Sequence, residues 1–470
     1  MPAAVLRLDY ANVLASAVGE EHGLLPDEIA RARPRAAEVL VRIERERAAG
    51  QHAYRNLPTD RGMLRQVQAA AKRRGPGLEN LVVLGIGGSA LGNIALQTAL
   101  NAPLYNLMSR NQRRGPRLFV MDNVDPVQFA NLLDVLGPGL RRTLFNVISK
   151  SGETTETAAQ LMIVRDLLAR RLGVRALPRH ILATTDPEKG VLRELARRDG
   201  YETLVVPPGV GGRFTVLSAV GLFSAAVCGA NIAKLLAGAA EMEERVARRD
   251  VEKNPAAMLA LLLYMFYTRG KRLHVMMPYS HQLKDLADWY RQLWAESLGK
   301  QQDVEGRPVV IGPTPIRALG ATDQHSQVQL YREGPNDKVF MLLEVEKFSR
   351  DVKIPRSKTA PAEWGYLRGS SLGTLLNAEK RATEGALVAS RRPCMTFRFP
   401  RVSEETVGQF ILLWEAATTI MGGLLNINPY DQPAVQLGKE YTFALMGRKG
   451  YEKQARMLEK LTRQDSRRTV

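Results

Sequence analysis

Short apolar runs alternate with helical patterns through most of the chain. The first runs are rich in β-branched residues and occupy positions 81–84, 117–121, 143–148, 180–184 and 202–206. Between them, apolar residues recur at intervals of three and four, as in the segment 158–172. Uninterrupted apolar strands separated by helices are typical of parallel sheets that are covered on both faces. The pattern therefore predicts an α/β protein.

A second set of such runs predicts a second domain. These runs lie at 272–277, 307–311, 339–345 and 394–399. We expect two doubly wound αβα domains with parallel sheets, at residues 56–240 and 241–430. We expect an N-terminal helical segment at 1–55 and a C-terminal helical segment at 431–470.

Composition favours a soluble cytoplasmic protein. The chain has 470 residues, of which 45% are hydrophobic and 24% are charged, which suits two full cores. Its two cysteines, Cys228 and Cys394, are too few for a disulfide framework. No signal peptide is visible after Met1. The uncharged segment 214–233 contains serine, threonine, glycine and asparagine, which favours a buried core helix over a membrane span.

The formal net charge of +18 raises the question of nucleic-acid binding. The basic residues are scattered, and the densest stretch, from Arg448 onward, contains few aromatic residues. We therefore favour a solvated surface that attracts anionic metabolites, with no nucleic-acid or membrane partner.

A polar cluster follows the apolar run 143–148, where a strand leads into a helix. It contains Ser149, Ser151, Thr154, Thr157 and Lys150. At a helix N-terminus, unpaired backbone N–H groups and the helix dipole favour an anion. An ordinary helix cap is the alternative, but the hydroxyls and the lysine exceed what one cap requires. The cluster predicts a site for a phosphate monoester.

A glycine-rich turn, Gly87-Gly88-Ser89, follows the run 81–84. It is compatible with a dinucleotide fingerprint, and equally with close approach of the backbone to a small anion. Because the carboxyl ends of parallel strands share one edge of a sheet, we expect Ser89 to lie beside the polar cluster.

Arg213 and Glu296 are candidates for chemistry, each with a structural alternative. Arg213 follows two glycines at the start of an apolar segment, where burial is costly unless the guanidinium meets an anion or a structural ion pair. Glu296 lies in the last turn of a helical pattern at 282–298. A helix C-terminus and apolar neighbours disfavour a charged carboxylate, which suits a general base. The alternative is a surface acid paired with Lys300.

Six motifs in chain order resemble the glucose-6-phosphate isomerase family. They are Gly87-Gly88-Ser89, Ser149-Lys150-Ser151 through Glu156, Gly211-Gly212-Arg213-Phe214, Ala295-Glu296-Ser297, Asp323-Gln324-His325, and Asp431-Gln432 with Gly438-Lys439. The resemblance covers roughly residues 50 to 450. It implies two sugar-isomerase (SIS) domains and a homodimer without a cofactor.

The resemblance also implies a role for each matched residue. The sugar phosphate would be held by Gly88, Ser89, Ser149, Lys150, Ser151 and Thr154. Glu296 would move a proton between two sugar carbons, and Arg213 would stabilise the enediolate. His325 and Lys439 would serve ring opening, and Gln432 would contact the sugar. In the family, the histidine reaches the active site of the partner subunit.

The activity implied is the reversible isomerisation of glucose 6-phosphate and fructose 6-phosphate in glycolysis and gluconeogenesis. The six histidines show no metal-ligand spacing, so we expect no metal. A non-catalytic regulatory protein that binds sugar phosphates is the alternative. Such a protein would not need Glu296, Arg213, His325 and Lys439 together.

Overall fold

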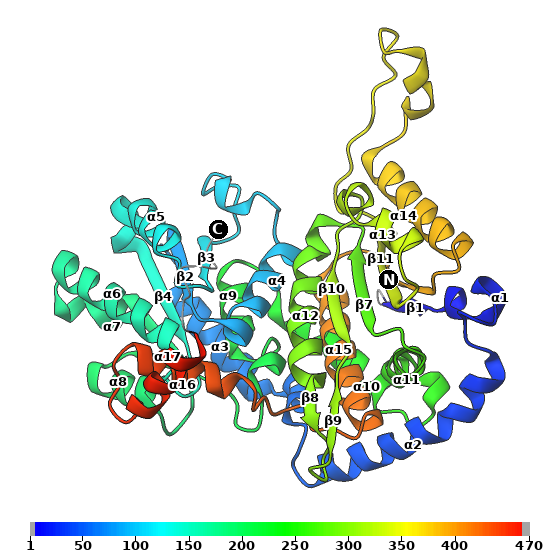
Figure 1. Ribbon diagram of the computed structural model, residues 1–470. Helices are drawn as coiled ribbons and strands as arrows, with labels where there is room; N and C mark the ends of the chain where they lie inside the picture. The colour runs from blue at the N-terminus through cyan, green and yellow to red at the C-terminus, as the bar shows by residue number, and fades with distance from the viewer. Residues whose placement is uncertain (1–4, 463–470) are drawn as a thin grey trace, which may run out of the picture.

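The computed structural model describes residues 5–462. They contain two five-stranded sheets, one wholly and one mainly of parallel strands, which lie side by side with helices on both faces of each (Figure 1). The first sheet has the order β3-β2-β4-β5-β6, with every neighbouring pair parallel. Its strands are β3 (Arg117–Met121), β2 (Asn80–Leu84), β4 (Thr143–Ile148), β5 (Ile181–Thr185) and β6 (Glu202–Val205). The predicted α/β class and the five strands of this sheet are confirmed.

Both faces of the first sheet are buried, which explains its uninterrupted apolar runs. Alternate residues of β2 enter different cores: Leu81 and Val83 belong to one, Val82 and Leu84 to the other. The second of these cores also contains residues of α5 (Pro126–Leu136), α6 (Thr155–Leu172) and α8 (Val191–Asp199). On the other face lie α3 (Arg61–Arg74), α4 (Leu91–Leu100) and α9 (Ala219–Val227).

The second sheet has the order β1-β12-β11-β7-β10. Its strands are β1 (Arg7–Asp9), β12 (Cys394–Phe399), β11 (Lys338–Val345), β7 (Leu273–Pro278) and β10 (Thr314–Arg317). Four are mutually parallel, and β1 is antiparallel at the edge. Part of the N-terminal segment that we expected to be helical therefore belongs to this sheet, although the segment also contains α2 (Pro26–Ala48).

One predicted strand of the second sheet is misplaced. The run 307–311 forms β9 (Pro308–Ile311), which pairs antiparallel with β8 (Lys300–Gln302) in a separate two-stranded ribbon. The edge position beside β7 is taken instead by β10. Pro313 and Pro315 flank the start of β10, and prolines weaken the strand signal because they cannot donate to a ladder.

The uncharged segment 214–233 is not one helix, as we expected, but spans two. It contains α9 and the start of α10 (Ile232–Val246), with a break at Gly229, whose φ is +91°. The predicted domain boundary at residue 240 falls inside α10. That helix packs along α15 (Glu404–Leu424), a core helix of the second half of the chain.

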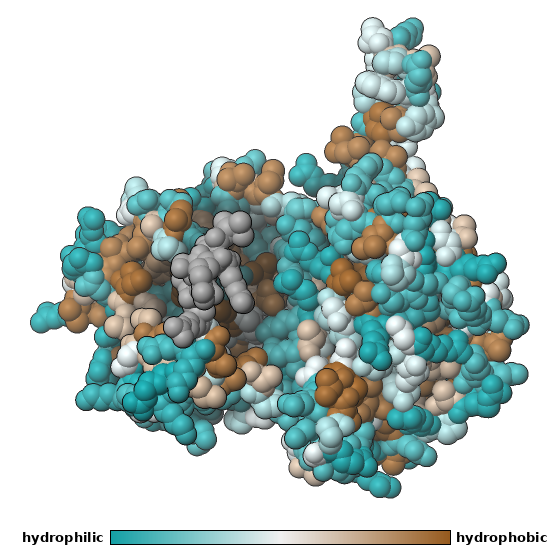
Figure 2. Space-filling view, viewed as in Figure 1, coloured by the Kyte–Doolittle hydropathy of each residue, from teal (hydrophilic) through white to brown (hydrophobic). Residues whose placement is uncertain are grey.

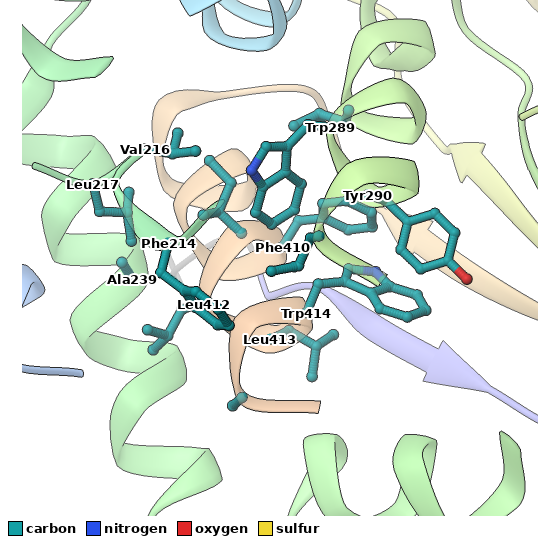
Figure 3. Close-up of a cluster of buried hydrophobic side chains, with 14 of the residues drawn as sticks. Phe214, Val216, Leu217, Ala239, Trp289, Tyr290, Phe410, Leu412, Leu413 and Trp414 are labelled. Carbon is teal, nitrogen blue, oxygen red and sulfur yellow. The ribbon is translucent and has the colours of Figure 1, made fainter. Parts of the chain in front are cut away.

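One continuous core joins the two sheets. At its centre lies α15, which is long and apolar enough to cross a membrane but has 94% of its most apolar window buried inside the protein. Figure 3 shows Trp414 of α15 packed against Tyr290 of α12 (Lys284–Leu298), with ring centroids 4.4 Å apart. Phe214 and Leu217 from the first half of the chain belong to the same core. This shared core fixes the position of α12 relative to the first sheet.

Two peripheral segments extend from this body. Residues 347–371, between β11 and α14 (Leu372–Ala389), project outward with Trp364 and Tyr366 exposed (Figures 1 and 2). Near the C-terminus, α16 (Val435–Leu445) and α17 (Glu452–Leu461) lie over the first domain and contain no buried residues within the described chain.

Candidate active site

A cavity of about 750 Å³ lies between the two domains. The first domain contributes Gly87 and Leu91 to its lining, and α12 contributes Gln292 and Glu296. The remaining wall comes from Lys300, Gln301 and the segment 432–435. Its volume is in the range of pockets that bind small molecules.

Arg213 and Glu296 form an ion pair at this cavity. Arg213 Nη1 lies 3.1 Å from Glu296 Oε1, although the two residues come from different domains. The guanidinium is 3% exposed and also donates to Ser297 Oγ at 3.0 Å, Gln432 Oε1 at 2.9 Å and Pro429 O at 3.0 Å. Burial lowers the pKa of Arg213, and the Glu296 carboxylate opposes this shift. The anion that Arg213 meets in this structure is therefore Glu296.

The Glu296 carboxylate is held from both sides and faces the cavity. Its Oε1 contacts Arg213, and its Oε2 accepts a hydrogen bond from Gln292 Nε2 at 3.0 Å. Its side chain is 25% exposed. We expected a largely apolar helix face around Glu296, and the structure adds a buried cation that contacts the carboxylate. The arrangement suits a base that can reach a bound ligand.

Lys300 is not the ion-pair partner of the Glu296 carboxylate that the sequence suggested. Its Nζ donates instead to the backbone oxygens of Glu296 at 3.1 Å, Ser297 at 2.8 Å and Asp431 at 3.0 Å. The first two belong to the last turn of α12, where a cation is favoured. Burial lowers the pKa of Lys300. Lys300 therefore fixes the end of the helix that carries Glu296.

The polar cluster after β4 forms a compact loop. Ser149 Oγ lies 3.2 Å from Thr154 Oγ1 and accepts from Gly152 N at 3.0 Å. Gly152 has φ +76°, and a Cβ there would lie 2.2 Å from Leu192 N, so the turn requires glycine. Exposed Lys150 donates to Val210 O at 3.3 Å, and the Ser151 hydroxyl accepts from Glu153 N at 3.2 Å.

This loop differs from the ordinary helix cap that we considered as an alternative. Thr154 is the N-cap residue of α6, yet within residues 5–462 its side chain makes no capping hydrogen bond. Thr157 Oγ1, in the first turn, is buried without a hydrogen-bond partner in the same range. Unpaired donors at a helix N-terminus favour a bound anion such as phosphate.

The glycine turn lies between this loop and Arg213. Leu84 pairs with Val147 across β2 and β4, so residues 85–89 and 149–154 follow neighbouring strands at the same sheet edge. A Cβ on Gly88 would lie 2.2 Å from Gly212 O, so the backbone of the turn packs against the Gly211-Gly212 segment. Ser89 ends the short helix η3 (Gly87–Ser89) at this point.

Of the predicted site residues, Glu296 and Gln432 line the cavity. Arg213, Gly88, Ser89 and the loop after β4 lie outside its lining, and so do His325 and Lys439. His325 ends the short helix η10 (Thr322–His325) in the second domain and is exposed, and its side chain has no hydrogen-bond or ion-pair partner among residues 5–462. Lys439 is also exposed, on α16. Val435 lines the cavity and lies four residues before Lys439, hence on the same helix face.

Sequence reasoning missed Gln292 and the role of Lys300. Gln292 lies four residues before Glu296, a spacing that places two side chains together on a helix and that could have identified it. No group of three or more potential metal ligands occurs in the described part of the chain. The groups at the cavity are instead cations, amides and one carboxylate, which suit a phosphorylated polyol and proton transfer.

Comparisons with known proteins give the family of this chain. The family model described as phosphoglucose isomerase matches residues 61–358. A glucose-6-phosphate isomerase of Carboxydothermus hydrogenoformans is 44% identical over 460 residues, which cover 98% of each chain. The crystal structure of a hypothetical protein from Thermus thermophilus is 36% identical, with a TM-score of 0.84, and the match covers 94% of this chain and 100% of that one.

A more distant solved structure shows the same fold. It is a glucose-6-phosphate isomerase of Chlamydia trachomatis, 22% identical with a TM-score of 0.69, and the match covers 95% of this chain and 78% of that one. From the family match and the nearly full-length relative, this chain belongs to the phosphoglucose isomerase family.

Proposed function

We propose that this protein interconverts glucose 6-phosphate and fructose 6-phosphate by transferring a proton through a cis-enediolate. The observation that carries the proposal is the Arg213–Glu296 pair, which places a base and a buried cation together at a cavity between two domains. Aldose–ketose interchange needs such a base, a cation for the developing negative charge, and a grip on the phosphate.

The phosphate group would bind at the loop after β4 and the neighbouring glycine turn. Its ligands would be Ser149, Lys150, Ser151 and Thr154 from the loop, with Gly88 and Ser89 from the turn. Because the phosphate does not react, its binding energy can position the sugar carbons against Glu296.

The proton transfer then follows from the positions of two side chains. The Glu296 carboxylate removes the proton from C2 of the open-chain aldose, and the electron pair of the broken bond moves toward the C1 carbonyl oxygen. The Arg213 guanidinium stabilises the negative charge on the enediolate. Glu296 returns the proton to C1, while the proton of the C2 hydroxyl passes to the C1 oxygen, so that C2 becomes the carbonyl carbon of the ketose. Gln432, which accepts a hydrogen bond from Arg213, would contact the sugar hydroxyls.

Ring opening requires an acid–base pair that one chain does not assemble. His325 is exposed on the second domain, so we propose that it enters the cavity of a second copy in a homodimer. Lys439 shares a helix face with Val435, which lines the cavity, and would act from its own chain. The proposed enzyme requires no cofactor and acts in the cytoplasm, in glycolysis and gluconeogenesis.

Activity is tested by converting fructose 6-phosphate to glucose 6-phosphate. An added dehydrogenase then oxidises the product with an oxidised nicotinamide cofactor, and the absorbance of the reduced cofactor is measured. The purified protein should turn over with a chelator present. Glu296→Gln should abolish turnover while substrate binding stays within about threefold, because the amide keeps the shape of the base. The matched control is Glu305→Gln, on an exposed turn. Binding without any turnover of the unmodified protein would favour the regulatory alternative.

Complementation tests the shared site. Glu296→Gln and His325→Ala chains, each inactive alone, should regain about a quarter of full activity after random reassortment, because half the dimers are mixed and each has one intact site. Mass spectrometry establishes that mixed dimers have formed. If they form and activity stays at background, the assignment of His325 to a second copy is wrong.

A further inference from the structure

A buried series of hydrogen bonds connects the surface to the segment beneath Arg213. Glu46 Oε2 lies 2.8 Å from His52 Nε2, and His52 Nδ1 lies 2.5 Å from Tyr430 Oη. The series continues from Tyr430 Oη to Thr419 Oγ1 at 2.9 Å and from there to Tyr54 Oη at 2.9 Å. His52, Thr419 and Tyr54 are at most 6% exposed. We call these five residues the Tyr430 network.

The network ends on the segment that holds Arg213. Tyr430 lies between Pro429 and Gln432, whose oxygens both accept from the Arg213 guanidinium, at 3.0 and 2.9 Å. The Tyr430 ring also packs on Phe214, with ring centroids 5.2 Å apart. Phe214 is the residue after Arg213 in the chain. Tyr430 therefore supports the guanidinium through both the acceptors above it and the backbone that carries it.

The protonation states of His52 and Tyr430 determine which group donates in each of these hydrogen bonds. Burial lowers the pKa of His52 and raises that of Tyr430 well above its usual range, so a neutral imidazole faces a protonated phenol. Tyr430 O–H can then donate to Nδ1, while Nε2–H donates to Glu46. The nearby cations, Arg47 and Arg55, further disfavour an imidazolium; both are paired with Glu243.

No residue of the Tyr430 network lines the cavity described above, so the network acts on the site only through what it holds. His52 has φ +57°, a left-handed conformation that few non-glycine residues adopt, although asparagine, aspartate and histidine do so more often than the others. This backbone conformation sets the position of the imidazole.

We propose that Tyr430 and His52 are positioning residues for the isomerisation, which hold the segment 429–432 so that Arg213 meets the charge that develops on the enediolate. The inference rests on the proposed function. A positioning role predicts a specific kinetic pattern: the transition state loses stabilisation, whereas the proposed phosphate subsite, which shares no residue with the Tyr430 network, is unaffected.

The first test is Tyr430→Phe in the full-length protein, which removes one hydroxyl and keeps the ring. We expect kcat to fall roughly tenfold, with KM for fructose 6-phosphate within about twofold. Competitive inhibition by inorganic phosphate should not change. A phosphorylated sugar acid, whose planar carboxylate mimics the enediolate, should bind roughly tenfold more weakly.

Tyr105→Phe is the matched control. It also removes a buried hydroxyl, which accepts from Gly115 N at 2.7 Å and donates to Cys228 O at 3.3 Å, but it lies outside the cavity and the network. This variant should lose stability and keep its kcat. An equal loss of kcat in both variants would overturn the inference, because destabilisation alone would explain it.

Two substitutions of His52 give an independent test that survives if Tyr430→Phe fails to fold. Asparagine places its side-chain oxygen near the position of Nδ1 and tolerates a positive φ, so His52→Asn should retain most of the kcat. His52→Leu has no acceptor for Tyr430 and should show the same loss of kcat as Tyr430→Phe. Equal activity of the Asn and Leu variants would overturn the inference.

The outcomes separate this inference from the proposed function. If the unmodified protein shows no isomerase activity, the proposed function fails first. If the unmodified protein is active and Tyr430→Phe has the same kcat and the same affinity for the sugar acid, only the positioning role is wrong.

Discussion

The stability of this protein should fall between pH 7 and pH 5 because of one histidine inside the second sheet. His274 lies on β7, is fully buried, and accepts a hydrogen bond from Trp294 Nε1 at 3.1 Å through its Nδ1. Burial lowers the pKa of His274 from 6.5 to about 3. The backbone of Lys271 opposes this shift only in part, so the folded protein keeps the imidazole neutral.

Proton linkage gives the direction and the size of this change in the free energy of unfolding. Below pH 6.5 the unfolded chain binds a proton at His274, whereas the folded protein does not bind it until about pH 3. The buried neutral His274 therefore does not reduce the free energy of unfolding above pH 6.5. Below pH 6.5 the free energy of unfolding decreases as the pH falls toward 3. With about 1.4 kcal/mol per pH unit once the unfolded imidazole is protonated, the loss between pH 7 and pH 5 is about 2 kcal/mol.

The assay compares urea unfolding of the unmodified protein and of His274→Gln at several pH values. A glutamine can still accept from Trp294 but does not titrate. The variant should be less stable at pH 7 because it packs less well, and the difference should shrink by about 2 kcal/mol at pH 5. The pKa values of His52, His180 and His281 are also lowered by burial, but their contributions cancel in the difference.

A buried hydroxyl that does not titrate in this range supplies the control. Tyr105, whose pKa burial raises to about 12, can be changed to Phe, and Tyr105→Phe should give a stability curve parallel to that of the unmodified protein from pH 7 to pH 5. If the His274→Gln curve is also parallel, the reasoning from burial is refuted. A direct reading comes from NMR of the folded protein, in which the His274 imidazole should not titrate between pH 8 and pH 5.

Three further changes have predictable effects. Lys150→Ala should weaken competitive inhibition by inorganic phosphate roughly ten- to a hundredfold, because one charge-assisted contact is lost; equal inhibition would exclude Lys150 from the phosphate site. Glu415 is fully buried, and burial raises its pKa well above 4.5. Above pH 4.5 the unfolded chain loses the proton of this carboxyl more readily than the folded protein does, so the free energy of unfolding decreases. Glu415→Gln should therefore raise Tm, and more at pH 8 than at pH 5. Val310 is β-branched, 78% exposed and has φ +46°, so Val310→Gly should stabilise the protein by about 1 kcal/mol in urea unfolding.

The first sheet could be predicted from sequence because its strands are buried on both faces. Such strands appear as continuous apolar runs with clear ends. The same reasoning missed β1 and β10, which have only three and four residues. Short edge strands gain their stability from pairing with distant partners, here β12 and β7, and that pairing leaves no local pattern.

Some features of the candidate site could also be predicted from sequence, and others could not. The neighbouring positions of Ser89 and the Ser149 cluster follow from strand order, which sequence can predict. The contacts of Arg213 with Glu296 and Gln432 join residues 83 or more positions apart in the chain, and no spacing predicts them. His325 and Lys439 are exposed in this chain, so only the family resemblance identifies them.

The shared core explains how residues so far apart can form one site. Glu296 is on α12, the loop 149–154 follows β4 of the first sheet, and Arg213 contacts Glu296. Because α12, α15 and α10 pack in one continuous core, the first sheet and the base cannot separate without exposing buried aromatic residues such as Trp289 and Trp414. Such exposure costs several kcal/mol for each large side chain. The geometry of Arg213 and Glu296 is therefore set before a ligand arrives, which is what electrostatic stabilisation of an enediolate requires.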